Sequence, residues 1–135
     1  MKATELIIGD IFNLSENNNE IIPCKVVELH TEELLIIQPQ DTACDVVGYD
    51  MIRPIPITPE ILEKNGGRVK NMCDGYDEWW IKLEYYYSYW LLNIIKEVDG
   101  SYEYNIDSFP IHYVHELQHA LRLCGLNNLA DNFKV

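Results

Sequence analysis

Five consecutive residues near the C-terminal end carry the residue types and the spacing of a zinc-peptidase motif. The segment His115-Glu116-Leu117-Gln118-His119 reads H-E-x-x-H. On a helix, the two histidines of this pattern lie one turn apart and bind Zn²⁺, and the glutamate activates the metal-bound water. The pattern raises the hypothesis of a zinc-dependent metallopeptidase in which His115 and His119 are the metal ligands and Glu116 is the base.

The remainder of the chain offers little to complete such a zinc site. A catalytic zinc needs three protein ligands and an open position. The longer pattern H-E-x-x-H-x-x-G-x-x-H fails, because Arg122 stands where Gly is required and Gly125 where the last His is required. Asp131 is the one acidic residue after the motif. We therefore expect a fortuitous match, with no catalytic residue, no metal and no cofactor, and keep the zinc peptidase as the alternative.

The element that must position the motif is a predicted helix over residues 112–124. Apolar residues recur on it at helical spacing, at Val114, Leu117, Leu121 and Cys124. The opposite face holds His115, Gln118, His119 and Arg122. This pattern predicts a helix with its aliphatic side inward and both imidazoles in water. Gly125 and Leu126 suit a Schellman cap, and the polar tail from residue 127 is expected to fray.

The first 57 residues predict β structure. The apolar run Glu5–Asn13 contains a bend at Gly9-Asp10, and Ile21–Leu29, Glu33–Gln38 and Asp45–Ile52 are further strand candidates. Short strands with tight turns favour a small, strongly bent barrel, and we expect an SH3-like one. Pro54 and Pro56 confine the segment that follows to an extended connector.

The second half is expected to combine two helices with a sheet. Thr58, Pro59 and Glu60 suit the start of a short helix, which Asn65-Gly66-Gly67 ends, and Arg68–Asp77 is expected to be a loop. Three antiparallel strands follow, at Trp79–Tyr87, Trp90–Val98 and Ser101–Ile106. Asp99-Gly100 is a hairpin turn between the last two.

These elements predict an α+β fold with its C-terminal helix packed on the three-stranded sheet. We expect one domain over residues 1–135, made of an SH3-like β region (1–57) and a helix–sheet–helix region (58–135).

Aromatic residues on the predicted sheet are the candidate binding residues. They are Trp79, Trp80, Tyr86, Tyr89 and Trp90. One interpretation is an aromatic inner face that packs the C-terminal helix. The other is a protein-binding surface, since Trp80 and Tyr86 fall on the polar side of the alternation and exposed Trp and Tyr often anchor partners. Stacking of a base or small nucleotide is a third interpretation.

The charge balance limits the class of partner. The 135 residues carry 22 Asp plus Glu against 10 Lys plus Arg, a formal net charge of −12. This argues against nucleic acid and against an anionic membrane, and favours a basic protein partner. The four cysteines show no C-x-x-C spacing, and no signal-peptide or membrane-spanning run is visible. We expect a protein of the cytoplasm.

Three blocks of the chain resemble an uncharacterised family of small proteins encoded by gut bacteria, their phages and mobile elements. The blocks are Met1–Gly9, Pro54–Leu62 (Pro-Ile-Pro-Ile-Thr-Pro-Glu-Ile-Leu) and Tyr113–Leu121 (Tyr-Val-His-Glu-Leu-Gln-His-Ala-Leu). The resemblance implies a phage or mobile-element setting, in the host cell, and implies no activity. It further implies Gln in place of Glu116 and Asn in place of His119 among relatives.

Three functions follow as hypotheses. The first is a non-catalytic binding protein that occupies a host protein, such as a defence component, or sequesters a small ligand. The second is the zinc peptidase. The third is a structural or packaging component of a phage. The oligomeric state is left open.

Overall fold

The computed structural model describes residues 5–15, 21–71, 77–81, 92–96, 102–106 and 109–135. The described chain is α+β, as the sequence predicts, and it divides into two compact units. Unit 1 comprises Met1–Pro56 and Tyr113–Phe133, and unit 2 comprises Ile57–His112 and Lys134–Val135. The chain leaves unit 1 at Pro56 and returns at Tyr113, so unit 2 is inserted between two parts of unit 1.

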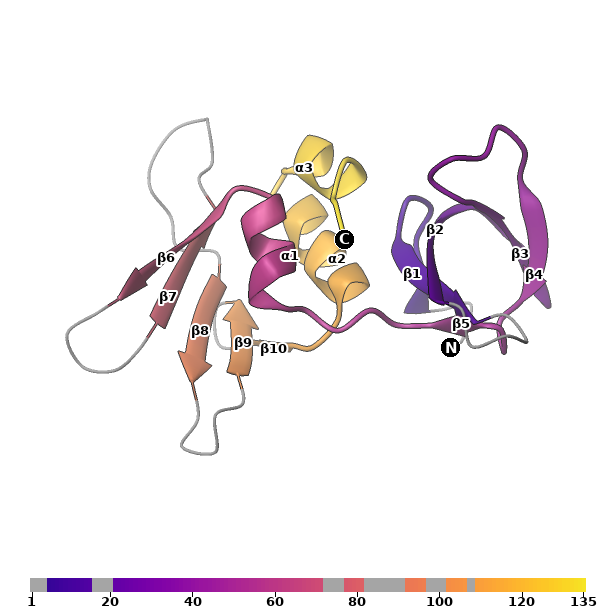
Figure 1. The fold of residues 1–135 in the computed structure, drawn as a ribbon. Coiled ribbons are helices and arrows are strands. Elements are labelled where there is room, and N and C mark those ends of the chain that lie inside the picture. Colours follow the sequence, from indigo (N-terminus) through magenta and orange to yellow (C-terminus); the bar gives the residue numbers. More distant parts are fainter. Residues whose placement is uncertain (1–4, 16–20, 72–76, 82–91, 97–101, 107–108) are drawn as a thin grey trace. The chain divides into compact units, whose positions relative to one another are not determined.

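Unit 1 contains an antiparallel sheet of five strands. The strands are β1 (Ile11–Ser15), β2 (Ile21–Leu29), β3 (Glu33–Ile37), β4 (Asp45–Gly48) and β5 (Ile52–Arg53). Their order is β4-β3-β2-β1-β5, and the sheet curls around its own core (Figure 1). The described strands do not close into the predicted barrel, because β4 and β5 remain the two edges and are not paired with each other.

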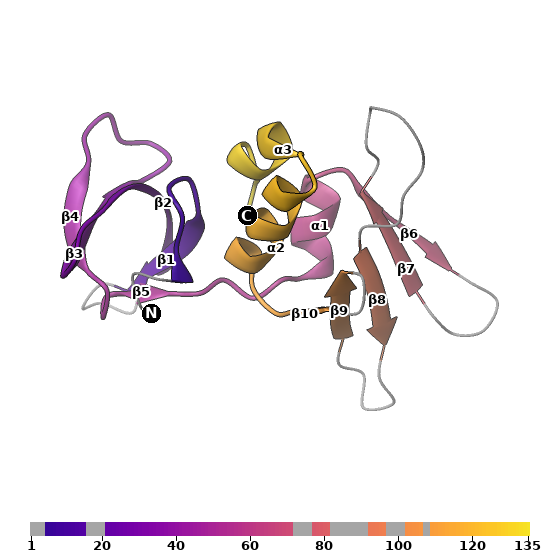
Figure 2. The same ribbon diagram turned by 180° about the vertical axis from the view of Figure 1, so that it is seen from behind.

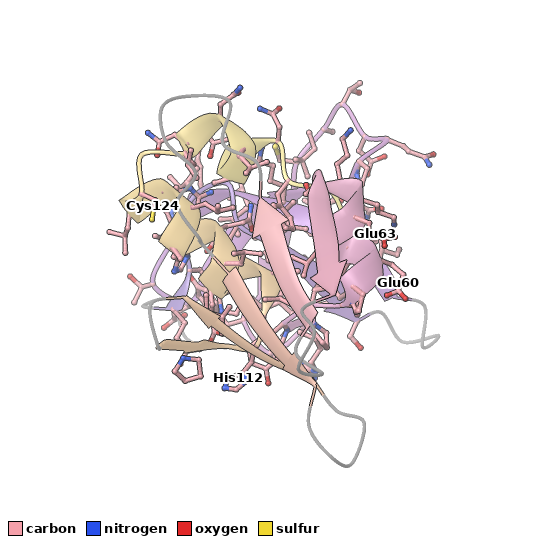
Figure 3. All side chains as sticks on the ribbon, turned by 90° about the vertical axis from the view of Figure 1, so that its left-hand side faces the viewer. Glu60, Glu63, His112 and Cys124 are labelled. Atoms are coloured by element: carbon pink, nitrogen blue, oxygen red, sulfur yellow. The ribbon has the colours of Figure 1, made fainter. Side chains whose placement is uncertain are left out.

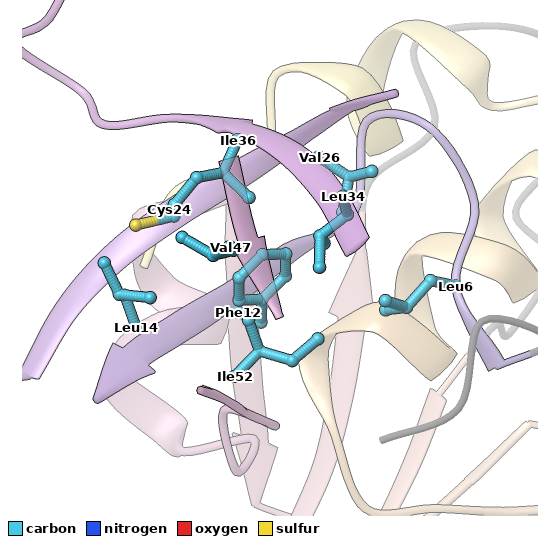
Figure 4. Packing of buried hydrophobic residues seen from close by; sticks show 9 residues of the cluster. All are labelled: Leu6, Phe12, Leu14, Cys24, Val26, Leu34, Ile36, Val47 and Ile52. Atoms are coloured by element: carbon cyan, nitrogen blue, oxygen red, sulfur yellow. The ribbon is translucent and has the colours of Figure 1, made fainter. Parts of the chain in front are cut away.

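The alternation of side chains along these strands builds the core of unit 1. Every second residue points to the concave side of the sheet. The side chains that meet there are those of Leu6, Phe12, Leu14, Cys24, Val26, Leu34, Ile36, Val47 and Ile52 (Figure 4). The β2–β3 register shifts between Val26 and Glu28, so Val27 is the extra residue of a bulge, a feature that bends a strand.

Unit 2 begins with the short helix α1 (Pro59–Lys64), which the sequence predicted. The Thr58 hydroxyl accepts a hydrogen bond from the Ile61 backbone N–H at 3.3 Å, and Pro59 occupies the first turn. The pKa of Glu60 is lowered, first by a backbone hydrogen bond and then by Thr58. Figure 3 shows Glu60 and Glu63 projecting from this helix, whose Ile61 and Leu62 are buried.

The second sheet has five described strands where three were expected. They are β6 (Gly67–Asn71), β7 (Asp77–Ile81), β8 (Leu92–Lys96), β9 (Tyr102–Ile106) and β10 (Phe109–Ile111), in the order β10-β9-β8-β7-β6. The loop prediction for Arg68–Asp77 was wrong at its start, since β6 pairs along its whole length with β7. Strands β8 and β9 pair as expected, while the predicted Asp99-Gly100 turn lies outside the described residues.

The C-terminal part of unit 1 is a pair of helices, α2 (Val114–Leu123) and α3 (Asn127–Asp131), seen from behind in Figure 2. The predicted Schellman cap is confirmed: Leu126 N–H donates to the Leu121 carbonyl at 2.9 Å, Gly125 N–H donates to the Arg122 carbonyl at 3.0 Å, and Gly125 has φ +78°. The prediction that the C-terminal tail frays was wrong, because the tail forms α3 and buries Ala130 and Phe133.

The packing of the C-terminal helix on the aromatic sheet stays a prediction, because the side chains of that sheet are not among those described. Helix α2 belongs to unit 1, and side-chain bonds tie it to the start of β1. Gln118 and Arg122 bond to residues 9–11, across more than a hundred residues of chain.

Candidate functional site

A buried carboxylate lies at the turn that leads into β1. Gly9 adopts φ +94°, and Asp10 follows it with no exposed surface. The Asp10 Oδ2 atom accepts a hydrogen bond from the Ile7 backbone N–H at 2.7 Å. A buried carboxylate is costly unless further donors or cations reach it.

Helix α2 supplies those donors. The Nε2 atom of His119 lies 2.7 Å from Asp10 Oδ2, and Nη1 of Arg122 lies 2.7 Å from Asp10 Oδ1. A carboxylate only accepts hydrogen bonds, so the contact with His119 places a proton on Nε2 of that imidazole. Arg122 also extends Nη2 to Asp131 at 3.3 Å, which links α2 to the end of α3.

Gln118, one turn before Arg122, bonds to three backbone groups. Its Oε1 atom accepts from the Ile11 N–H at 2.9 Å, and its Nε2 atom donates to the carbonyls of Gly9 at 3.1 Å and Ala130 at 2.7 Å. The side chain is fully buried. One amide thus joins the β1 turn, α2 and α3. We call Asp10, Gln118, His119 and Arg122 the polar seam of unit 1.

Gly9 permits the close approach of this helix. A Cβ atom at position 9 would lie 2.9 Å from Nη2 of Arg122. The positive φ also disfavours any residue with a side chain. The backbone conformation therefore favours glycine at position 9, and a side chain there would also require the end of Arg122 to shift.

The aliphatic side of the helix faces inward as predicted, but the predicted exposure of its polar face was wrong. Its polar face was expected in water, yet Gln118 is fully buried and His115 is only 6% exposed. The aliphatic residues Val114, Leu117 and Leu121 are fully buried as well. Periodicity shows that a helix has a polar side. That side can still be buried when hydrogen-bonding groups of other segments lie against its polar side chains.

The residues of the H-E-x-x-H motif do not fit a zinc site in this structure. The Nε2 atom of His119 is held by Asp10, and a carboxylate oxygen of Glu116 accepts the Tyr113 N–H at 3.1 Å, at the start of its own helix. Within the described residues, no group of three or more His, Cys, Asp or Glu side chains is arranged to hold a metal ion. Glu116 instead caps the helix, and Gln118 and His119 belong to the polar seam.

His115 is the one member of the motif with an unused buried atom. Its Nδ1 has no hydrogen-bond partner, and its ring stacks on Tyr113 with centroids 5.9 Å apart and meets His119 edge-on at 5.8 Å. Desolvation lowers the pKa of His115, although the charges of Asp10 and Glu116 act in the opposite direction. The environment therefore favours the neutral imidazole.

The five aromatic candidates cannot be placed as a surface. Trp79 and Trp80 lie in β7, where their backbones pair with Val69 and Arg68, and their side chains are not among those described. Tyr86, Tyr89 and Trp90 lie outside the described residues. The aromatic binding surface stays a prediction.

Three residues of the polar seam were not singled out as partners by the sequence: Asp10, Gln118 and Arg122. A signal was present in the sequence. Asp10 follows a bend inside an apolar run, and Gln118 and Arg122 stand four residues apart on one helix face. Nothing in the pattern says that these two segments meet.

Comparison with known proteins gives no relative from which a function could be transferred. No family model matches the chain. No curated protein matches it, and no solved structure matches it. Among the described helices, none has the length and apolar character that crossing a membrane requires.

Proposed function

We propose that this protein is a non-catalytic binding protein that acts by occupying a protein of the host cell. One observation carries the proposal: the His119 imidazole of the H-E-x-x-H motif is bonded through Nε2 to Asp10 at 2.7 Å. The nitrogen that would bind zinc is used inside the fold. This contact supports a structural role for the motif, and we place the binding capacity of the chain on its surface.

The charge of the chain supports a basic protein as the partner. A net charge of −12 attracts cationic surfaces over a distance set by ionic strength and disfavours phosphate-rich ligands. The resemblance to proteins of phages and mobile elements supports a cytoplasmic host protein, for instance a defence component, as the target. Sequestration of a small ligand is the other form of the same non-catalytic hypothesis.

The strand order also supports the SH3-like interpretation as part of this proposal. A meander of β1 to β4 followed by a short β5 that returns to β1 is the order expected for such a small barrel. Small barrels of this kind serve widely as binding modules, which is an argument from fold analogy alone.

The proposal is tested by cross-linked capture of partners from host cells together with metal analysis of untagged protein. We expect that a basic partner is captured, and that the Glu116→Gln variant captures as much of it as the wild type does. This change removes only the hypothetical catalytic base. Near-stoichiometric zinc that disappears in His119→Ala, with peptide hydrolysis that disappears in Glu116→Gln, would contradict the proposal and establish the peptidase.

A further inference from the structure

The outer face of the unit 1 sheet carries apolar side chains that the core does not use. Leu34, Ile36 and Val47 point into the core, so Leu35, Ile37 and Val46 lie on the other side of β3 and β4. Leu35 and Val46 are directly opposite each other in the register. Val46 is 57% exposed, and Leu35 and Ile37 are half-buried. We call Leu35, Ile37 and Val46 the outer apolar strip.

Carboxylates flank this strip. Glu33 precedes Leu35 on the same face of β3, and Glu28 of β2 is opposite Leu35 in the register. Both are exposed. Glu28 lies 3.3 Å from the exposed His30. The strip therefore has an apolar centre with a negative border beside Leu35.

The cations of unit 1 do not balance this border. In the described part of unit 1 the lysines and arginines are Lys25, Arg53 and Arg122. Lys25 is opposite Ile37, but its ammonium donates to the Asp131 carbonyl at 2.7 Å. Arg53 donates to the carbonyls of Asp50 and Ile52, and Arg122 belongs to the polar seam. Each of these cationic groups is already bonded within its own chain.

We propose that this face docks a basic segment of a partner protein. An aliphatic side chain of that segment covers Val46 and Leu35, and its lysines or arginines lie against Glu28 and Glu33. Edge strand β4, next to the strip, is paired only with β3 among the described strands, so an extended segment can lie alongside it. The inference deepens the proposed function and rests on it.

Charge disfavours two other occupants of the same face. A second copy of the chain would add a further net charge of −12 and would place its carboxylates against those of the first copy. An anionic membrane would be repelled for the same reason. A cationic partner alone gains from both the apolar centre and the negative border.

The experiment selects binders from a displayed library of random dodecapeptides on the full-length protein and measures each by fluorescence anisotropy. The selected peptides are expected to be rich in Lys or Arg and in Val, Ile or Leu. Val46→Ser is expected to lower the affinity for these peptides about tenfold, because it removes an apolar anchor of the binding face. The matched control is Leu123→Ser, which alters a side chain that is 90% exposed on α2 and should leave affinity unchanged.

The charged border is tested with a second pair of variants. Glu33→Gln is expected to weaken the same peptides roughly threefold at low salt, and less at high salt. The control Glu63→Gln removes an exposed carboxylate from α1 in unit 2 and should have no effect. Thermal unfolding verifies that all four variants are folded.

Several results overturn the inference. They are an absence of binders, selection of acidic peptides, equal affinity of Val46→Ser and Leu123→Ser, or self-association that Val46→Ser abolishes. A host partner captured equally by the wild type and by Val46→Ser would overturn this docking face while leaving the proposed function in place. Failure of the proposed function itself is recognised separately, by stoichiometric zinc in the untagged protein and by peptide hydrolysis.

Discussion

The apolar core of unit 1 and the two central residues of its polar seam, Asp10 and Gln118, are buried, yet different interactions stabilise them. Phe12, Leu34 and Ile36 in the core gain from removal of apolar area from water, which has no preferred direction. Asp10 and Gln118 in the seam gain only where donors and acceptors meet at bonding distance. The core should therefore tolerate changes of shape that conserve volume, whereas the seam should tolerate few changes of any kind.

The largest expected effect comes from emptying the core. Phe12→Ala removes a ring with no exposed surface and leaves a cavity, and we expect a loss of about 4 kcal/mol in the free energy of unfolding. Chemical denaturation measures this. Phe12→Leu, which keeps most of the volume, should lose far less. If the two variants lost equal stability, the core would tolerate volume-conserving substitutions no better than the seam does. That result would contradict the contrast drawn between the two regions.

The next largest effect tests the seam. Gln118→Leu conserves size but leaves the N–H of Ile11 and the carbonyls of Gly9 and Ala130 without their partner. We expect a loss of about 3 kcal/mol, because unsatisfied buried groups retain their desolvation cost. The control is Gln40→Leu at an exposed position, where stability should hardly change. A stable Gln118→Leu variant would show that the seam adds nothing beyond apolar packing.

The same contrast explains what the sequence could predict. Runs rich in Ile, Val and Leu located β2 and β3, and the Thr58-Pro59 and Gly125 signals located α1 and the end of α2, since these depend on residues close in the chain. The seam could not be predicted, because it joins residue 10 to residues 118–122, and no local pattern encodes that meeting. Strand β6 was missed for a related reason: the polar Arg68–Asn71 is held by its pairing with β7 rather than by apolar alternation.

A smaller effect is expected at the glycine that brings the two segments together. Gly9→Ala introduces both a positive-φ penalty and a clash with Arg122, and we expect a loss of about 2 kcal/mol. Gly66→Ala separates the two causes, since Gly66 has φ +82° but open space around its Cβ position. It should cost about 1 kcal/mol. Equal losses, measured by thermal unfolding, would mean that Arg122 moves aside and that the seam is looser than its distances indicate.

The smallest expected effect is the pH dependence that His115 contributes. Its pKa in the folded state is lowered by desolvation, an effect reduced by the charges of Asp10, Glu116 and Glu5. In the unfolded chain the pKa returns to about 6.5. As the pH falls below about 6.5, the unfolded state binds a proton that the folded state resists, so the free energy of unfolding decreases. The loss is complete once the pH is below the folded-state pKa, and it is absent at higher pH.

Comparison of two variants isolates this contribution. His115→Phe keeps a planar ring against Tyr113 but cannot titrate, so the decrease in stability from pH 7 to pH 5 should be less steep than in the wild type. The control His30→Gln removes an exposed histidine near Glu28 and should keep the wild-type slope. Urea unfolding at several pH values measures all three proteins. Parallel curves for the wild type and His115→Phe would show that the unpaired Nδ1 lies in an environment as polar as water. Water would then reach position 115, and the contrast between the apolar core and the hydrogen-bonded seam would not extend to this residue.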